Sequence, residues 1–276
     1  MKTLIIIPTY NEAENLSPLL QAIFSYAPLT DVLIVDDHSP DGTGELADSL
    51  QKQDMRLHVL HRTGKLGLGT AYLAGFKFAL AHGYDVAFEM DADFSHDPSS
   101  LPAFLRAVED ADVVIGSRYM VGGGTLNWSA LRRLISGSGN IFARLMLSIP
   151  IHDCTSGFRC YRRRVLASLD LDAVQSHGYA FQVELTYRVM LQGFQIIETP
   201  IVFRDRRCGK SKMSQAILLE ALTYVLQTRL SQLVNELKSQ VKLIRRVRNL
   251  HLEKLNIISG HFGPVVGEQG RHRDML

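Results

Sequence analysis

Short apolar runs alternate with amphipathic stretches along the first half of the chain. The apolar runs are rich in Val, Ile and Leu, which is typical of strands that are buried on both faces of a sheet. In the stretches between them, apolar residues recur at helical spacing. This alternation predicts a parallel α/β sheet with right-handed crossovers. We expect strands at 3–8, 31–37, 56–61, 85–91 and 112–117, and helices at 12–26, 41–53, 68–82 and 98–110.

The second half of the chain has a less regular pattern. A glycine-rich loop, VGGGTLNW at 121–128, precedes a basic helical stretch at 129–147, and a helix at 179–192 comes before a strand-like run at 194–203. From about residue 213, apolar residues step by three or four and predict a long amphipathic helix, and the last fifteen or so residues of the chain look frayed. The apolar stripe of the long helix is Leu219, Leu222, Leu226, Leu230, Leu233, Leu237, Val241 and Ile244.

The charges divide the chain unevenly. Of the 276 residues, 46% are hydrophobic and 21% are charged, which is the composition of a globular protein. Residues 213–276 hold nine Lys or Arg against five Asp or Glu, a net +4, and the remainder holds 21 against 23, a net −2. We expect a main domain over 1–212 and a basic helical extension over 213–276 that has an anionic partner. Nucleic acid is not expected, because the sheet portion is acidic and no aromatic residues interleave the basic helix.

Three features bear on the compartment. The cysteines Cys154, Cys160 and Cys208 show no close metal-type pairing, and an odd, sparse cysteine count is typical of a reducing compartment. The N-terminal apolar run ends at Pro8 and is too short for a signal peptide. No run of 18 or more apolar residues occurs. We expect a cytoplasmic protein.

Polar clusters follow the expected strands at the point where each strand ends. They are PTYNE, DDHSPDGT, HRTGKLGLGT, DADFSHD and GSRY. Because the carboxyl ends of parallel strands meet at one edge of a sheet, where ligands bind, these clusters predict one polar cleft. The first cluster lacks the G-x-G-x-x-G pattern of a dinucleotide site, and GKLGLGT fails the spacing of a phosphate-binding P-loop.

The segment EMDADFSHDP at 89–98 contains the most concentrated charge of these clusters. Asp91 and Asp93 are two residues apart and so share one side of an extended segment. Carboxylates placed in this way suit Mg²⁺ or Mn²⁺, which takes one or two of them together with the phosphates of a substrate. Ser95 or His96 is a candidate to complete the metal shell, and a solvated loop is the alternative. Asp97 before Pro98 is a typical helix cap.

Eight motifs in register resemble one protein family. They are IPTYNEAENL, VDDHSPDGTGELA, LHRTGKLGLGTAYLAGF, EMDADFSHDP, GSRY with the GG and NW that follow it, TSGFRCYRR, SHGYAFQVEL and GKSKM. From about residue 3 to residue 213 the chain resembles the polyprenol-phosphate mannose synthases, also called dolichol-phosphate mannosyltransferases. The resemblance implies an inverting family-2 glycosyltransferase of the GT-A fold, with a mostly parallel central sheet flanked by helices. It implies transfer of mannose from GDP-mannose to a polyprenyl (dolichyl-type) monophosphate.

The resemblance also implies roles for individual residues. A divalent ion would lie on Asp93 and the Ser95 position. Some relatives have glutamine in place of Ser95, and the shorter serine implies a contact through water. The guanine and ribose would be held by Pro8, Tyr10, Glu12, Val35 and Asp37, and the diphosphate by Asp91, Ala92 and Asp93. Donor or acceptor phosphates would be held by Arg118, Arg206 and Lys212. The lipid phosphate would be held by Arg132 and Ser136.

Physical chemistry supports a role for the basic residues. Arg118 directly follows an expected strand, at the same sheet edge as Asp91, and arginine presents a bidentate fork to phosphate oxygens. The run RDRRCGKSK at 204–212 is either a basic lid over the donor or a solvated loop. The resemblance favours the lid for Arg206 and Lys212, whereas Arg204, Arg207 and Lys210 are expected to be solvated.

A phosphate acceptor changes what the enzyme has to do. A phosphate monoester, with a second pKa near about 6, is largely ionised at neutral pH and needs no general base. The site must instead hold two anions within attack distance, with the metal ion on the leaving side and Arg118 and Arg132 on the entering side. In-line attack inverts the anomeric carbon and gives a β-linked product. The residues expected to carry catalysis are Asp93, Arg118, Arg132, Ser136 and Lys212, and Glu184 either orients the sugar or pairs with a nearby arginine.

The C-terminal helix and the donor each leave alternatives. A basic amphipathic helix either lies on an anionic membrane surface or packs against its own domain or a second subunit, as in a homo-oligomer. Family members often carry transmembrane helices at this point, and this chain has none. We expect a peripheral protein on the cytosolic face of a membrane, held there by this helix or by an anchoring subunit. The alternatives for function are the same chemistry with UDP-glucose or another sugar nucleotide, and a non-catalytic nucleotide-sugar or membrane-binding module.

Overall fold

The computed structural model describes residues 1–174, 176, 178–205, 219–234, 236–238, 240, 242 and 246. The chain divides into a compact unit, Met1–Thr228, and a second unit that begins at Arg229. The expected boundary between residues 212 and 213 lies outside the described residues, so it stays a prediction.

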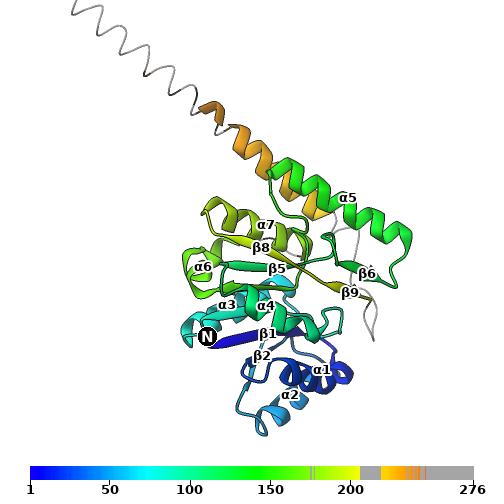
Figure 1. Ribbon diagram of the computed structural model, residues 1–276. Coiled ribbons are helices and arrows are strands. Elements are labelled where there is room, and N and C mark those ends of the chain that lie inside the picture. Colours follow the sequence, from blue (N-terminus) through cyan, green and yellow to red (C-terminus); the bar gives the residue numbers. More distant parts are fainter. Residues whose placement is uncertain are drawn as a thin grey trace, which may run out of the picture. The chain divides into compact units, whose positions relative to one another are not determined.

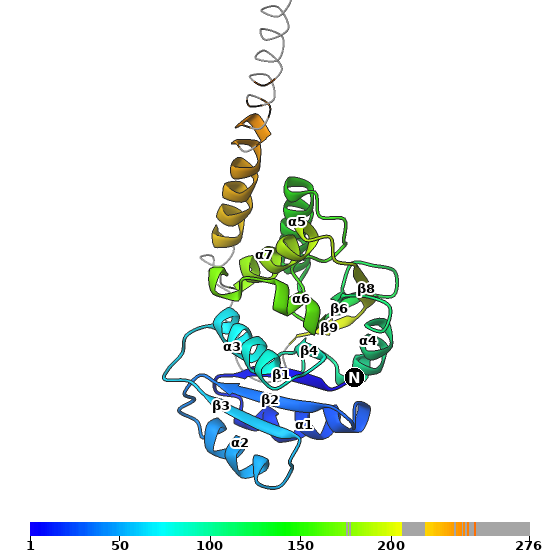
Figure 2. The same cartoon turned by 90° about the vertical axis from the view of Figure 1, so that its left-hand side faces the viewer.

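A seven-stranded sheet forms the centre of the first unit (Figures 1 and 2). Its strand order is β3-β2-β1-β4-β7-β5-β8, and every strand runs parallel to the others except β7. A separate small sheet pairs β6 with β9 in parallel. The strands are β1 Thr3–Thr9, β2 Asp31–Asp36, β3 Leu57–His61, β4 Val86–Glu89, β5 Val113–Ser117, β6 Gly124–Leu126, β7 Arg159–Arg162, β8 Ile196–Pro200 and β9 Val202–Arg204.

Seven α-helices lie between residues 13 and 191 of this unit, together with two short 3₁₀ helices. They are α1 Ala13–Tyr26, α2 Thr43–Gln51, α3 Leu68–Ala81, η1 Pro98–Ser100, α4 Leu101–Ala107, α5 Ala130–Leu147, α6 Arg163–Ser168, η2 Leu171–Ala173 and α7 Gly178–Leu191. The expected helix at 98–110 begins as η1, and the Asp97 side chain caps it by accepting a hydrogen bond from Ser99 N, as predicted. The predicted mostly parallel sheet flanked by helices is confirmed.

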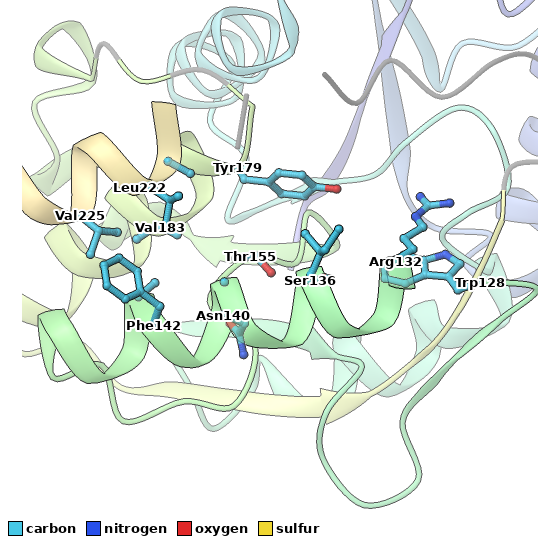
Figure 3. A pocket seen from close by; sticks show the side chains of 14 residues that line it. Trp128, Arg132, Ser136, Asn140, Phe142, Thr155, Tyr179, Val183, Leu222 and Val225 are labelled. Atoms are coloured by element: carbon cyan, nitrogen blue, oxygen red, sulfur yellow. The ribbon is translucent and has the colours of Figure 1, made fainter. Parts of the chain in front are cut away.

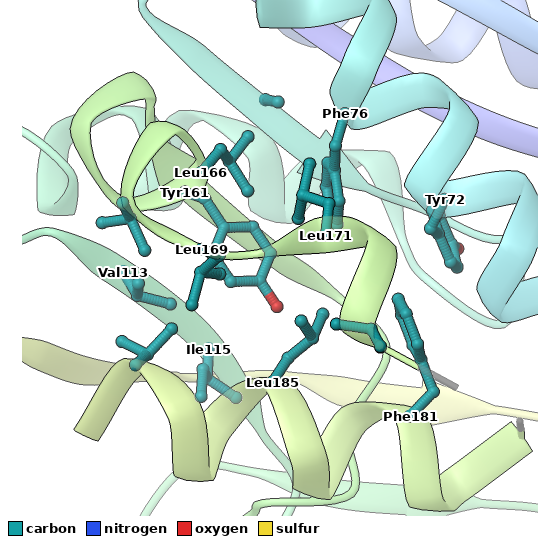
Figure 4. Packing of buried hydrophobic residues seen from close by; sticks show 14 of the residues in the cluster. Tyr72, Phe76, Val113, Ile115, Tyr161, Leu166, Leu169, Leu171, Phe181 and Leu185 are labelled. Atoms are coloured by element: carbon teal, nitrogen blue, oxygen red, sulfur yellow. The ribbon is translucent and has the colours of Figure 1, made fainter. Parts of the chain in front are cut away.

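Each strand of the sheet buries apolar side chains on both faces. In β1, Leu4 and Ile6 belong to one hydrophobic cluster, while Ile5 and Ile7 belong to the other. Successive side chains of a strand point to opposite faces, so the unbroken apolar runs in the sequence correspond to a sheet covered on both sides. The first cluster packs under α3, α5, α6 and α7, with Phe76 and Tyr161 in edge-to-face contact (Figure 4). The second cluster packs under α1, α2 and α4.

Strand β7 was not predicted from the sequence. It is four residues long, begins and ends with arginine, and lies antiparallel between β4 and β5. Its two central residues, Cys160 and Tyr161, are buried. A strand this short has no readable alternation, and its place is set by tertiary pairing.

Helical residues are also described at 219–234, within the helix predicted from about residue 213. Residues 213–218, Val241 and Ile244 lie outside the described part of the chain. In the first unit Val225 is buried, whereas Leu219 and Leu226 are exposed. Among the described helices, none combines the length and apolar character needed to cross a membrane.

Candidate active site

The carboxyl ends of β1, β2, β4 and β5 meet at one edge of the sheet, as predicted. The chain leaves three of these strands through residues with left-handed backbone: Asn11 (φ 59°), His38 (φ 57°) and Phe94 (φ 61°). This conformation costs roughly 1–2 kcal/mol for a residue with a Cβ atom, and bulky residues rarely adopt it. Backbone strain of this kind concentrates at functional sites. We call the four carboxylates at these ends, Asp36, Asp37, Asp91 and Asp93, the acidic edge.

At the end of β2, Asp36 and Asp37 hold the neighbouring loops. Asp36 accepts hydrogen bonds from Thr9 Oγ1 (2.9 Å) and from Ser39 Oγ (2.6 Å). Asp37 Oδ2 accepts from the backbone N atoms of residues 66 and 67, at 3.1 and 3.2 Å, and its Oδ1 lies 2.8 Å from Arg62 Nη1. Asp37 therefore orders the GKLGLGT loop, and its predicted contact with the nucleotide stays a prediction.

The other residues predicted to hold the base and ribose surround the end of β1. Lys65 Nζ lies 4.2 Å from the centroid of the Tyr10 ring, and Glu12 Oε2 accepts a hydrogen bond from Asn15 Nδ2 at 2.8 Å. Val35 is fully buried in β2, between Pro8 of β1 and Leu60 of β3, and its predicted contact with the nucleotide stays a prediction. Pro8 pairs with Val35 across β1 and β2. The structure thus places the predicted base and ribose residues at the same sheet edge.

The turn after β4 holds Asp91 and Asp93. Asp91 is about one third exposed at the side chain (31%), and its Oδ1 accepts a hydrogen bond from Tyr72 OH at 3.1 Å. Asp93 is buried, and its Oδ1 accepts from Ser95 N at 3.0 Å. Ala92 and Ser95 are buried as well. Each carboxylate is therefore held by a hydrogen bond from within the chain, which is how protein carboxylates are oriented for ligand binding.

His96 holds the turn after β4 in place. Its Nδ1 accepts a hydrogen bond from Asp91 N (3.0 Å), which leaves the ring proton on Nε2, 3.9 Å from Asp91 Oδ2. The ring stacks on Phe158 with 4.9 Å between centroids. Burial lowers the pKa of His96, so the ring stays neutral. Because Nδ1 already accepts a backbone hydrogen bond, the structure makes His96 a support of the turn. Neither this role nor that of Tyr72 was predicted, because both depend on tertiary contacts.

The residues present fit a divalent ion that is shared with a substrate. In the described residues no cluster of three or more His, Cys, Asp or Glu side chains has metal-binding geometry. Mg²⁺ and Mn²⁺ sites that bind nucleotides take one or two carboxylates from the protein and complete their shell with phosphates and water. Asp91 and Asp93, held as described, meet that need.

A buried polar network lies beneath the acidic edge. Glu89, the last residue of β4, is fully buried and accepts a hydrogen bond from Gln182 Nε2 at 2.6 Å. Burial raises its pKa to about 7. It is paired across the strands with Arg159, which is also fully buried and donates to Thr186 Oγ1 and to three backbone carbonyls. This network joins β4, β7 and α7 under the site.

Arg118 follows β5 and is buried in an ion pair with Asp153. Its Nε and Nη2 donate to Asp153 Oδ2 and Oδ1 at 2.7 and 2.8 Å, and Nη2 also donates to Thr155 Oγ1 at 2.8 Å. Burial alone would lower the pKa of Arg118, but the Asp153 carboxylate outweighs it and raises that pKa. No hydrogen bond joins Nη1 to a described residue. Nη1 is thus the nitrogen of the Arg118 guanidinium that takes no part in the ion pair with Asp153.

Arg132 lies in the first turn of α5, which Ser129 caps by accepting from Arg132 N. Arg132 Nη1 donates to Asp205 Oδ1 at 2.9 Å, and its guanidinium carbon lies 4.2 Å from the Trp128 ring centroid. Arg132 Nε and Trp128 Nε1 are buried donors with no hydrogen-bond partner among the described residues. Such orphaned donors are rare in a finished core and point to an absent acceptor. One turn along α5, Ser136 Oγ accepts from Tyr119 OH at 2.8 Å.

An open pocket adjoins these residues, and we call it the α5 cavity; the space of about 680 Å³ that it spans includes open solvent (Figure 3). Arg132, Ser136 and the hydroxyl group of Tyr179 lie toward one end, and the other end is apolar. Burial raises the pKa of Tyr179, against the opposing effect of Arg118 and Arg132, so its hydroxyl stays protonated. The lining residues are Trp128, Arg132, Ile135, Ser136, Gly139, Asn140, Phe142, Ala143, Thr155, Tyr179, Val183, Ala221, Leu222 and Val225.

Two further predictions concern residues near the cavity. For Glu184 the sequence predicts one of two roles, orienting the sugar or pairing with a nearby arginine. It is buried on α7, and its Oε1 lies 2.6 Å from Arg188 Nη2, while Ser176 N donates to its other oxygen. The pairing is therefore the role that the structure shows. The basic lid falls outside the described residues at Arg206 and Lys212, and at Arg207 and Lys210 as well.

The chain is similar to known proteins over most of its length. The family described as Glycosyl transferase family 2 matches residues 4–170. The chain is 51% identical over 225 residues to the undecaprenyl-phosphate mannosyltransferase of Micrococcus luteus, which covers 82% of this chain and 93% of that protein. It is also 51% identical over 223 residues to the polyprenol monophosphomannose synthase of Mycolicibacterium smegmatis, covering 80% of this chain and 84% of that protein.

Solved structures share the fold at low sequence identity. A glucosyl-3-phosphoglycerate synthase from Mycobacterium tuberculosis, crystallised with Mn²⁺, UDP and glucosyl-3-phosphoglycerate, matches with a TM-score of 0.59 at 17% identity, over 83% of this chain and 79% of that chain. A mannosyltransferase from Pyrobaculum calidifontis, crystallised with GDP-Man and Mn²⁺, matches with a TM-score of 0.52 at 16% identity, over 91% of this chain and 80% of that chain. At these identities the likeness concerns the fold alone.

Proposed function

The chain belongs to glycosyltransferase family 2 and, within it, to the polyprenyl-phosphate mannosyltransferases, and from this premise we propose that it transfers mannose from GDP-mannose to a polyprenyl monophosphate. The observation that carries this proposal is the pairing of the acidic edge with the α5 cavity. The acidic edge presents carboxylates that are held in place by hydrogen bonds, and these suit a metal-bound diphosphate. The α5 cavity joins half-buried cationic and hydroxyl groups to an apolar end, as a lipid phosphate requires.

The donor lies at the acidic edge in this proposal. Asp91 and Asp93, with the Ser95 position, would hold Mg²⁺ or Mn²⁺ beside the donor diphosphate. The ion supplies positive charge that neutralises the leaving group. Tyr72 and His96 keep Asp91 in place. The residues that hold the base, ribose and diphosphate are those named from the sequence: Pro8, Tyr10, Glu12, Val35, Asp37 and Ala92, with Arg206 and Lys212 over the phosphates.

The acceptor phosphate lies at the polar end of the α5 cavity. Arg132 Nε and Trp128 Nε1 are the orphaned donors that it satisfies, and Ser136, Tyr179 and Arg118 Nη1 are the other polar groups at hand. The phosphate is already ionised and attacks the anomeric carbon without a general base. These residues hold it in line with the leaving diphosphate, so the configuration inverts to β. The first isoprene units occupy the apolar end.

We also propose that the enzyme works at a membrane surface, on the cytosolic face. The acceptor is a lipid, and the basic helical extension after residue 213 carries the charge that attracts anionic lipids. An anchoring subunit, or a second copy of the chain packed on that extension, is the alternative role.

Donor competition tests the proposal most directly. The purified protein, Mg²⁺ or Mn²⁺ and a polyprenyl phosphate are incubated with GDP-mannose and with UDP-glucose in parallel, and sugar incorporated into lipid is counted. We expect incorporation from GDP-mannose and essentially none from UDP-glucose. Consumption of UDP-glucose alone contradicts the donor assignment, and no incorporation from either donor favours a binding module.

A further inference from the structure

Asn140 is the one polar residue that helix α5 buries. It is 2% exposed, whereas every residue of α5 before it, at 130–139, is exposed or half-buried. Arg132 and Ser136 lie two turns and one turn earlier, so the three residues follow one another along the helix, and all three line the α5 cavity (Figure 3). Asn140 is therefore the buried residue of α5 that lies nearest to Arg132 and Ser136.

The Asn140 amide joins α5 to the loop at 152–155. Its Nδ2 donates a hydrogen bond to the carbonyl oxygen of His152, and its Oδ1 accepts from Cys154 N and from Cys154 Sγ, both at 3.0 Å. A buried amide with satisfied hydrogen bonds specifies one arrangement of the groups around it, whereas apolar contacts are non-directional. Asn140 thus sets the position of α5 on this loop.

The same loop holds Arg118. Asp153 accepts hydrogen bonds from Arg118 N, Nε and Nη2, at 3.0, 2.7 and 2.8 Å. The loop is also fixed to β8, because the Glu198 carboxylate accepts from the backbone N atoms of residues 152 and 153, at 2.7 and 2.9 Å. Arg118 is therefore attached to a loop that is itself held by the sheet.

From these contacts we infer that Asn140 is a positioning residue, which sets the spacing between Arg118 and Arg132 so that both bind the acceptor phosphate. The guanidinium carbons of Arg118 and Arg132 lie 5.6 and 4.2 Å from the centroid of the Trp128 ring, so both cations lie against one ring. Arg118 is held by the loop at 152–155, Arg132 belongs to α5, and Asn140 is a buried link between loop and helix. This inference rests on the proposed function, since it takes the anion that the arginines share to be the acceptor.

Two cations that share one anion depend on their spacing. Arginine binds phosphate oxygens through directed N–H groups, so a displaced guanidinium loses its hydrogen bonds. A misplacement of about 1 Å can lower a rate about a hundredfold. The Asn140 oxygen is committed to Cys154, so the residue acts on the acceptor through Arg132. Loss of the amide should therefore weaken recognition of the phosphate and leave binding of the prenyl chain in place.

Binding of a short prenyl chain with and without its phosphate tests the inference. Trp128 is the single tryptophan of the chain and lines the α5 cavity, so its fluorescence reports binding there. Farnesyl phosphate and farnesol are titrated into the unaltered full chain and into Asn140→Ala. The preference for the phosphate should fall at least about tenfold in Asn140→Ala, because the two arginines no longer share it. The affinity for farnesol should change by less than about twofold.

Leu147→Ala is the matched control. Leu147 is the last residue of α5, is 1% exposed and is not among the residues that line the cavity. Loss of its side chain leaves a void in the core and should lower the urea midpoint at least as far as Asn140→Ala does. The control should keep the preference for farnesyl phosphate. Asn140→Ser, which keeps a small polar group in the same place, repeats the comparison if Asn140→Ala does not fold.

Mannose transfer to farnesyl phosphate gives a second readout. Asn140→Ala should lower kcat/KM for the acceptor at least about tenfold and leave the KM for GDP-mannose unchanged. In a chain that already carries Arg132→Ala, the same change should cost less than about threefold, because Asn140 acts through Arg132. A residue that only stabilises the fold would lower activity by the same factor in both backgrounds.

Four results would overturn the inference. They are a preference for phosphate that survives in Asn140→Ala, an equal loss of that preference in Leu147→Ala, losses from Asn140→Ala and Arg132→Ala that multiply, and an unaltered chain that binds farnesyl phosphate no better than farnesol. Absence of mannose transfer by the unaltered chain overturns the proposed function instead. The fluorescence titrations need no donor, so they still decide the role of Asn140 in that case.

Discussion

The acidic edge and the α5 cavity satisfy their polar groups in opposite ways. At the acidic edge the carboxylates of Asp36, Asp37, Asp91 and Asp93 all accept hydrogen bonds from within the chain. Around the α5 cavity, two buried donors, Arg132 Nε and Trp128 Nε1, have no such partner among the described residues. On α5 itself, large aliphatic side chains such as Leu134 and Leu145 are exposed.

This difference indicates how each substrate is bound. The donor meets groups that the protein has already oriented, whereas the acceptor supplies partners that the protein lacks. A donor that carries a diphosphate and a metal ion needs fixed ligands, and a prepared set of oriented carboxylates reduces the cost of ordering them on binding. A lipid acceptor brings its own apolar surface and its own charge. The protein needs only to leave donors and apolar walls open to it. The two halves should therefore respond differently to substitution.

The largest effect is expected at the acidic edge, from Asp93→Asn. Loss of a metal-binding carboxylate should lower kcat about a thousandfold, because the ion supplies several kcal/mol of charge stabilisation. The measurement is mannose incorporation into lipid, together with Mn²⁺ affinity in the presence of GDP. Asp97→Asn is the matched control, since Asp97 lies in the same segment, where it caps η1 and pairs with Arg204 at 3.5 Å, and has no expected metal contact. A variant at Asp93 that keeps a tenth of its activity would contradict the metal assignment.

The second-largest effect should distinguish the acidic edge from the α5 cavity. Arg132→Ala should lower kcat/KM for the polyprenyl phosphate about a hundredfold, because a buried, charge-assisted contact to the acceptor is lost. The KM for GDP-mannose should change little. Arg133→Ala is the control, because it removes the neighbouring charge of α5 on an exposed side chain. If donor KM rises as much as acceptor KM, the edge and the cavity do not act as separate binding halves.

Asp153→Asn probes the link between them and should cost tens of fold in acceptor kcat/KM. The change removes the negative charge that pairs with the buried Arg118. Leaving a buried charge without its partner typically destabilises a protein by about 3–5 kcal/mol. The double variant Arg118→Gln/Asp153→Asn should transfer mannose no more slowly than Arg118→Gln alone, since Asp153 acts through Arg118. Urea unfolding measures the stability of each variant beside its activity. Additive losses of activity would show that Asp153 has a role of its own.

The acidic edge was predictable from the sequence, and much of the rest was not. Each of its carboxylates follows a strand whose apolar run is readable, and parallel topology brings strand ends together. The partner of Arg118 lies 35 residues away, in a loop without periodicity, so the ion pair has no local signal. β7 is equally hidden, because its four residues gain their place only from β4 and β5.

The cavity was predicted in part. Arg132 and Ser136 came from the resemblance to known mannose synthases, whereas Tyr179, Val183 and Val225 join them only through the packing of α5, α7 and residues 221–225. The exposed aliphatic side of α5 was hidden for a different reason. A helix at 129–147 with apolar residues is expected to bury them, and only the structure shows which side faces outward.

The smallest effect is expected from Tyr72→Phe, which removes one hydrogen bond to Asp91 and no charge. Because the carboxylate stays in place and loses only an orienting contact, the Mn²⁺ concentration for half-maximal activity should rise about tenfold. The rate at saturating Mn²⁺ should fall by less. The matched control is Tyr84→Phe. Tyr84 OH donates to Asp31 Oδ2 at 2.7 Å, so it makes the same kind of bond at the opposite edge of the sheet.

The two tyrosine variants together decide whether the bond to Asp91 serves the metal ion or only the fold. Each loses one tyrosine–aspartate hydrogen bond, worth about 1 kcal/mol, and Tyr84→Phe also loses the contact of its hydroxyl with His58 Nε2, so its melting temperature should fall at least as far as that of Tyr72→Phe. Only Tyr72→Phe should raise the Mn²⁺ requirement. If both variants show the same Mn²⁺ dependence as the unaltered chain, the hydrogen bonds at the acidic edge stabilise the protein without preparing it for the donor. The contrast between a prepared edge and an open cavity would then rest on the orphaned donors of the cavity alone.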